Sequence, residues 1–248
     1  MQPDDLIKKS QDGESLTKAE RIEMLGYPPD SADTYRVMAE AGRIFRELTD
    51  NKAEVHAQFA LDLAPCARHC LFCSFAETNG MFRQETRITP EEAVASARQL
   101  EAEGANAVFM MTTAHYPFGH YLEISWEVRR NLKPETMLIA NIGDQSLKNA
   151  LRLREGTDTT IPPERRRESI RNFQEAGLKV GTCVEPLGPE HTNEEIADMI
   201  LYTGSFDPAY SGAARRIPIP GTEMARRSGR AFPVKNEQIT CVWPNASG

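Results

Sequence analysis

The strongest constraint on the fold is an alternation of predicted helices and short apolar strands that starts near Thr89. Thr89 and Pro90 form a typical helix start, an N-cap followed by proline at the first helical position, and this helix is expected to end at Gly104. Further helices are expected near 122–132, from Pro162 or Pro163 to Gly177 and over 192–202, and strands over 107–113, 137–142, 179–184 and 215–219. Strands separated by helices of this length are typical of βαβ units and a parallel sheet. The sequence therefore predicts an α/β fold that closes as a partial or complete (β/α) barrel.

The chain before this alternation has a different pattern. Residues 1–50 are polar, with apolar positions such as Ile22 and Leu25 at helical spacing, and Pro28 and Pro29 divide the region because proline interrupts a helix interior. Residues 55–63 then alternate between apolar and polar, which predicts the first strand. The expected organisation is an N-terminal helical extension over 1–52, a barrel over 53–226 and a C-terminal tail over 227–248.

One interval does not fit the alternation. Between the strand expected over 137–142 and the helix that ends at Gly177, only residues 143–161 are available for another helix and strand. Residues 151–154 read as a short strand, which leaves almost no helix before it. Either a helix has been lost or a segment is missing from this sequence.

Composition excludes several classes of protein. The chain has 248 residues, is 40% hydrophobic and carries a formal net charge of −7, so it can bury a core without disulfides and is not expected to bind nucleic acid through overall charge. No stretch approaches 18 consecutive apolar residues, and the first 20 residues contain no apolar signal segment. We therefore expect a cytoplasmic protein without a membrane partner.

Three of the five cysteines are clustered. Cys66, Cys70 and Cys73 have the spacing C-x3-C-x2-C and lie on a loop after the first predicted strand. Three thiolates are one short of the usual set for a [4Fe-4S] cluster, so one iron would stay open to a small molecule. The alternatives are a zinc site that recruits His69, a disulfide that leaves one cysteine over, and an incidental cluster.

The run CARHCLFC, with Phe72 before the last cysteine, resembles the signature of the radical SAM superfamily. The resemblance implies that Cys66, Cys70 and Cys73 bind a [4Fe-4S] cluster. It also implies that the open iron chelates the amino and carboxylate groups of S-adenosylmethionine (SAM). One electron from the reduced cluster would cleave SAM, and the resulting 5′-deoxyadenosyl radical would abstract a substrate hydrogen. Phe72 would flank the adenine.

Over residues 33–224 the chain looks like the biotin-synthase-like branch of that superfamily. The resemblance implies that Thr112 and Thr113 contact the amino group of SAM, that Arg154 and Glu155 hold SAM, and that Arg166 binds a carboxylate. The ordinary alternatives are that the threonines cap a turn, that Glu155 is a solvated loop carboxylate and that Arg166 lies on an exposed helix face. His115, Tyr116, His120 and Asp144 follow strand ends and could face a substrate.

The chain departs from biotin synthase where that enzyme binds a second cluster. The corresponding positions are Met110, Ile139 and Gly181, and Cys183 alone cannot build a cluster. The biotin reaction is therefore disfavoured.

The sequence thus predicts a radical SAM enzyme with a partial (β/α)6-type TIM barrel and an N-terminal helical extension. The resemblance implies a role in cofactor biosynthesis, with lipoyl-synthase-like sulfur insertion as one candidate reaction. Its partners would be a small-molecule or carrier-protein-bound substrate, an electron donor such as ferredoxin or flavodoxin, and a possible second subunit. The rival hypotheses are a zinc-binding interaction module and a non-catalytic iron–sulfur scaffold.

Overall fold

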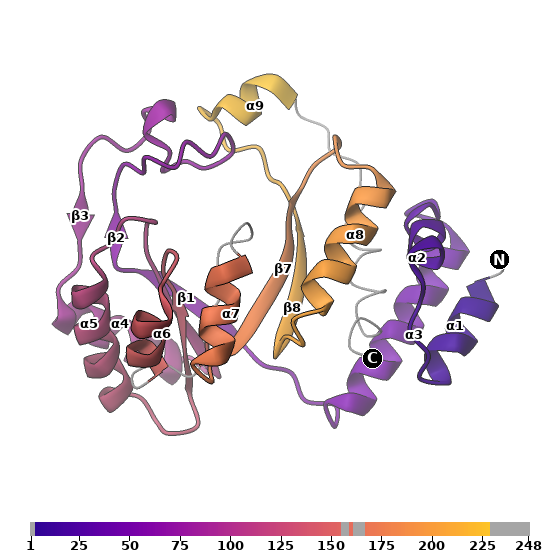
Figure 1. Cartoon of the computed structure of the whole chain (residues 1–248), viewed down its shortest axis with the longest axis horizontal. Coiled ribbons are helices and arrows are strands. Elements are labelled where there is room, and N and C mark those ends of the chain that lie inside the picture. The colour runs from indigo at the N-terminus through magenta and orange to yellow at the C-terminus, as the bar shows by residue number, and fades with distance from the viewer. Residues whose placement is uncertain (1–2, 155–158, 161–166, 229–248) are drawn as a thin grey trace. The chain divides into compact units, whose positions relative to one another are not determined.

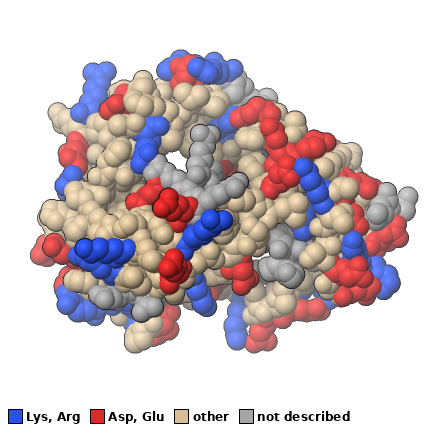
Figure 2. Space-filling view, viewed as in Figure 1, with Lys and Arg blue, Asp and Glu red and all other residues tan. Residues whose placement is uncertain are grey.

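The computed structural model describes residues 3–154, 159–160 and 167–228. In this part the chain forms two compact units. One contains the chain up to Ala53 together with Thr182–Ile217, and the other contains Glu54–Gly181 together with the chain from Pro218. No helix in the described ranges is long and apolar enough to cross a membrane. On the face shown in Figure 2, basic and acidic side chains are interspersed.

The first unit is mainly helical. It contains α1 (Pro3–Gln11), α2 (Lys18–Leu25), α3 (Ala32–Leu48), α8 (Asn193–Gly204), β8 (Tyr210–Arg215) and the later part of β7 (Lys179–Leu187). Helix α1 packs on α3, and α2 packs on α8. One buried apolar cluster contains Leu6, Leu25, Val184, Ile196 and Ile200, so residues far apart in the sequence build this core.

The second unit is a parallel α/β structure. Its strands are β1 (His56–Ala60), β4 (Ala107–Met111), β5 (Met137–Asn141), β6 (Thr159–Thr160) and the start of β7, each paired in parallel with the next. The helices between them are α4 (Pro90–Ala102), α5 (Phe118–Asn131), α6 (Leu147–Arg154) and α7 (Arg167–Glu175). Each of these helices packs against the next, and α4 also contacts β1 and β4 (Figure 1).

The strand register determines which side chains share a face of this sheet. Val108 pairs with Leu138 and Met110 with Ala140, and all four are fully buried. The alternate residues include Met111 and Asn141, which are only partly buried. Because side chains alternate along a strand, Met111 and Asn141 lie on the face opposite to these four buried residues.

The predicted barrel is found only in part. The six-stranded sheet has the order β1-β4-β5-β6-β7-β8, and in the described residues its first and last strands are not neighbours. The sheet is therefore open, and the fold is α/β with a partial-barrel arrangement of strands.

The interval 143–161 is short but contains both expected elements. The prediction of a strand at 151–154 is wrong, because helix α6 spans Leu147–Arg154. Ala150 and Leu153 are fully buried, whereas Leu151 is 44% exposed. Residues three apart lie on the same side of a helix but on opposite faces of a strand, so this burial pattern is helical. The strand that follows, β6, has two threonines and lacks an apolar signal. The predicted start of α7 at Pro162 or Pro163 lies outside the described residues.

Two strands of the structure have other bounds than the sequence predicts. The strand expected over 55–63 is divided at Leu61, whose N–H donates to Met111 O at 2.9 Å and whose carbonyl accepts from Ile88 N at 3.0 Å. After it, β2 (Asp62–Leu63) pairs antiparallel with β3 (Thr86–Arg87).

The last strand is β8 rather than the predicted 215–219. Pro218 and Pro220 lack the N–H that a ladder needs, and Ile217 is 74% exposed. The strand instead contains the small residues Ser211, Gly212 and Ala213. Such residues do not produce an alternating apolar pattern.

Candidate functional site

The three clustered cysteines lie on a loop whose ends are held together by backbone hydrogen bonds. Cys66 follows β2, and its N–H donates to Phe75 O at 2.7 Å while its carbonyl accepts from Glu77 N at 3.0 Å. Cys66 and Ala76 form a bridge of the kind seen between strands. Residues 67–74 are therefore a closed loop with Cys66 at its base.

Cys70 and Cys73 occupy a turn within this loop. The Cys73 N–H donates to Cys70 O at 3.1 Å, and the preceding His69 has a left-handed backbone with φ 53°. Cys66 is buried, Cys73 half-buried and Cys70 exposed, and all three thiols are free of disulfides. The loop therefore carries three thiols that form no disulfide.

The side chains of the loop are not gathered around one point. In the described residues, no group of three or more His, Cys, Asp or Glu side chains is close enough together to hold a metal ion. A single zinc ion would require its thiolates to converge at about 2.3 Å from the metal, whereas each thiolate of an iron–sulfur cluster binds a different iron. Both kinds of metal site stay predictions. The thiol chemistry and the closed loop fit a cluster.

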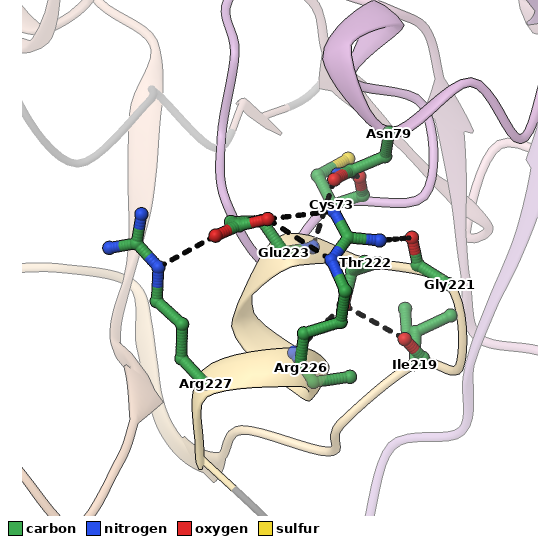
Figure 3. Close-up of polar contacts among 9 residues, drawn as sticks. Cys73, Asn79, Ile219, Gly221, Thr222, Glu223, Arg226 and Arg227 are labelled. Carbon is green, nitrogen blue, oxygen red and sulfur yellow. Dashed lines mark hydrogen bonds and ion pairs between the residues drawn. The ribbon is translucent and has the colours of Figure 1, made fainter.

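A side-chain bridge connects the loop to a later part of the chain. Asn79, in the short helix η1 (Glu77–Asn79), donates from Nδ2 to Cys73 O at 2.9 Å and accepts through Oδ1 from Glu223 N at 2.9 Å. Glu223 begins α9 (Glu223–Ser228), and Met224 N donates to Leu71 O at 3.0 Å. Figure 3 shows Asn79 and Cys73 beside the start of α9 at Glu223.

Aromatic residues flank the cysteines. Phe72 is 37% exposed, so its ring is accessible on the loop. Phe75 and Phe82 stack with their ring centroids 4.6 Å apart, which packs the segment that follows Cys73. Tyr116 is buried near Arg87, whose guanidinium carbon lies 5.3 Å from the ring centroid. Burial raises the pKa of Tyr116, and Arg87 opposes that shift.

The carboxyl ends of β1, β4 and β5 come together next to one another. Asp62, just beyond β1, accepts a hydrogen bond at 2.8 Å from Thr113 N, just beyond β4. Thr112 N donates to Asn141 O at 3.2 Å. The loops after β4 and β5 also touch, because a Cβ on Gly143 would lie 2.6 Å from Ala114 O. Active sites of barrel-like α/β proteins form at this edge.

The structure therefore brings some of the predicted site residues together. Thr112 and Thr113 lie at the carboxyl edge of the sheet and are partly buried. Of the other polar residues after strand ends, His115 and His120 are exposed, and the carboxylate oxygens of Asp144 are shielded from solvent.

Three predicted SAM-binding residues lie wholly or partly outside the described part of the structure. Glu155 and Arg166 lie outside the described residues. Arg154 is the last residue of α6 and is not in a strand as predicted, and its side chain is outside the described set. Their predicted roles remain predictions.

The positions that correspond to the second-cluster ligands of biotin synthase do not lie on one face of the sheet. Met110 and Ile139 are fully buried, and they lie on opposite faces of the sheet because Met110 pairs with Ala140 and Ile139 with Phe109. In the other unit, Cys183 lies on β7, 3.5 Å from the position a Cβ would take on Gly212.

Two residues of the site were missed by the sequence reasoning. In the sequence, Asp62 is only a polar position in an alternating strand. Its place in the site depends on its hydrogen bond with Thr113, 51 residues away. Asn79 carries no local signal, because its partner Glu223 is 144 residues away. Only the tertiary structure reveals either contact.

Comparison with known sequences identifies distant relatives. No protein-family model matches the chain. Biotin synthases from the Florida and St. Maries strains of Anaplasma marginale are each 26% identical over 197 residues, covering 71% of this chain and 60% of theirs. The chain thus spans less than two thirds of the length of these curated relatives.

Solved structures share the fold. HydG, a maturase of the [FeFe]-hydrogenase, superposes with a TM-score of 0.81 and 16% identity over 99% of this chain and 61% of its own. Methylornithine synthase (PylB) gives a TM-score of 0.80 and 16% identity over 98% of this chain and 77% of its own. The HydG of Carboxydothermus hydrogenoformans gives 0.76 and 17% over 99% and 64%.

These similarities agree with the cysteine motif and with the α/β architecture of the sheet. Biotin synthases and hydrogenase-cofactor maturases are the relatives that the sequence motif indicated. The resemblance that the motif indicated is therefore confirmed: the chain is similar to biotin synthases in sequence and to HydG and PylB in fold.

Proposed function

We propose that this chain is a radical SAM enzyme whose [4Fe-4S] cluster is held by Cys66, Cys70 and Cys73. The observation that carries the proposal is the set of three thiols without disulfides on one closed loop, next to the carboxyl edge of a parallel sheet. The sequence relatives and the fold support the same assignment. When bound, a cluster with SAM at its open iron supplies reductive cleavage of SAM and a radical that abstracts hydrogen.

Different residues would bind the cluster, hold the loop backbone and contact SAM. The three thiolates would bind three irons, and the Asn79 amide would fix the backbone at Cys73 through its bond to the carbonyl. The exposed ring of Phe72 would offer a flat apolar surface to the adenine. The half-buried oxygens of Thr112 and Thr113 would face the amino group of SAM.

The proposed reaction class is hydrogen abstraction in cofactor biosynthesis. Sulfur insertion would require a donor cluster, and Met110, Ile139 and Gly181 cannot supply thiolates for one. A second subunit would therefore have to provide the sulfur. The proposed partners are an electron donor such as ferredoxin or flavodoxin and a small-molecule or carrier-protein-bound substrate.

The test replaces one cysteine of the loop and one outside it. After anaerobic reconstitution, Cys70→Ala should lose the visible absorbance of the cluster and most of its iron and sulfide. The matched control, Cys183→Ala, should retain both, because Cys183 lies outside the loop. Equal iron content in the Cys70→Ala variant and the wild type would overturn the assignment. Zinc in place of iron in the wild type would return the chain to the interaction-module hypothesis.

A further inference from the structure

A buried carboxylate lies directly behind Thr113. Asp62 is 4% exposed and accepts two hydrogen bonds from this one residue, from the backbone N–H at 2.8 Å and from the side-chain hydroxyl. Burial of a carboxylate is costly unless hydrogen bonds compensate it, and bonds to an ionised acceptor are stronger than neutral ones. The Asp62–Thr113 contact is therefore a strong local constraint.

This contact determines what the Thr113 hydroxyl can do on its other side. A hydroxyl has one hydrogen to donate and two lone pairs that accept. Because Asp62 takes the hydrogen, the oxygen can only accept a hydrogen bond from a ligand. A buried negative charge behind it further favours a cationic donor such as an ammonium group.

The surrounding contacts leave Thr113 accessible for this role. Its neighbour Thr112 donates its own hydroxyl to Asn141 O at 3.4 Å, so it also presents lone pairs. Arg87 stands opposite Asp62 in the β2–β3 pair, and its guanidinium bonds to Glu85 and lies over Tyr116. Thr113 is itself only partly buried.

We propose that Asp62 is a positioning residue that holds Thr113 as the hydrogen-bond acceptor for the α-ammonium group of SAM. This inference rests on the proposed function and adds a residue that the resemblance does not supply. Asp62 acts through Thr113 and does not itself contact the ligand.

The decisive variant is Asp62→Asn, which keeps the shape of the side chain but replaces one acceptor oxygen with an NH₂ donor. The asparagine oxygen can still accept from the Thr113 N–H, but its NH₂ group would donate to the Thr113 oxygen. The hydroxyl hydrogen would then turn toward the ligand and oppose an ammonium group. Reconstituted Asp62→Asn should keep its iron and bind SAM at least about tenfold more weakly, which corresponds to about 1.4 kcal/mol.

Two further comparisons separate positioning from general damage. Thr113→Ser should bind SAM like the wild type because it keeps the hydroxyl, whereas Thr113→Val should bind weakly. The double variant Asp62→Asn/Thr113→Val should be no weaker than the weaker single variant, because both changes remove one interaction. An analogue of SAM that lacks the amino group should bind equally to the wild type, Asp62→Asn and Thr113→Val.

Equilibrium dialysis of the reconstituted proteins gives these affinities. Three results would overturn this inference in a wild type that still cleaves SAM. Asp62→Asn could bind SAM with wild-type affinity, or the affinity losses of the two single variants could multiply in the double variant. The variants could also lose as much affinity for the analogue as for SAM. A wild type that neither binds nor cleaves SAM would instead overturn the proposed function, and this inference with it. If Asp62→Asn does not fold, wild-type affinity of Thr113→Val for SAM would still overturn the inference, because Asp62 acts only through the Thr113 hydroxyl.

Discussion

Single side chains determine how the cysteine loop is held, and Asn79 shows this most clearly. Both ends of its amide are used, one on the Cys73 carbonyl and one on the first N–H of α9. Thr222 and Arg226 add bonds within the same segment, to Ile219 O and Gly221 O. In Figure 3 these contacts form one connected group beside Cys73. Cys73 is thus tied to a residue far along the chain through a single amide.

Asn79→Ala should therefore reduce both stability and cluster retention. Loss of two partly buried hydrogen bonds should lower the free energy of unfolding by about 1–3 kcal/mol, measured by urea denaturation. Iron per chain after gel filtration should fall as well. Asn131→Ala is the matched control, because Asn131 bonds to Glu127 on an exposed helix end. Equal iron retention in the two variants would show that Asn79 does not support the cluster loop.

In the helical unit, an ion pair between Glu190 and Arg216 makes stability depend on pH. Two hydrogen bonds from Arg216, whose side chain is 4% exposed, lower the pKa of Glu190 from 4.5 to about 2. The folded state therefore holds the carboxylate more strongly than the unfolded state does. This contribution is complete above about pH 4.5 and is lost as the pH falls toward 2.

Glu190→Gln should consequently be less stable than the wild type at pH 6, and the difference should shrink at pH 3. Urea denaturation at the two pH values measures it. Because Glu190 is half exposed, solvent screening keeps the effect small. A difference that grows on acidification would contradict the assigned ion pair.

Elements were predictable from sequence where their signals are local. The N-cap Thr89 and its capping box with Glu92 are present, and α4 ends within two residues of the predicted end at Gly104. Strand β4 is buried throughout most of its length, and its apolar run identified it. Strand β6 and helix α6 were not identified, because a two-residue strand of threonines and an eight-residue helix give too little pattern.

The candidate site was predictable to the same extent. The cysteine spacing is local and identified the loop, whereas the contacts of Asp62 with Thr113 and of Asn79 with Glu223 join residues 51 and 144 positions apart. No local pattern can report such contacts. The roles of Glu155 and Arg166 stay predictions.

The contact between the loops after β4 and β5 gives a prediction at the scale of elements. Gly143→Ala would place a methyl group 2.6 Å from Ala114 O, so the two loops must separate, at a cost of about 1–3 kcal/mol. SAM binding should weaken because Thr113 lies directly before Ala114 in the displaced loop. Thermal denaturation and equilibrium dialysis measure the two effects.

Gly119→Ala is the control, because a Cβ there meets nothing within 4 Å and Gly119 lies in α5. This variant should be as stable as the wild type or more stable by roughly 0.5–1 kcal/mol. If Gly143→Ala behaves like Gly119→Ala, the loops are not in contact as described.

At the scale of the whole molecule, the chain combines a helical unit with a parallel α/β unit that carries the cysteine loop. Its sheet is open, and the fold is shared with HydG and PylB over nearly the whole chain. The sequence offers one triad of clustered cysteines. A single cluster should therefore account for all the iron of the reconstituted protein.

The most direct test measures iron together with SAM cleavage in the wild-type chain. After anaerobic reconstitution we expect about four irons per chain and slow release of 5′-deoxyadenosine from SAM when dithionite supplies the electron. Iron binding without 5′-deoxyadenosine would contradict the enzymatic proposal and leave an iron–sulfur scaffold. About six irons or more per chain would contradict the single-cluster account.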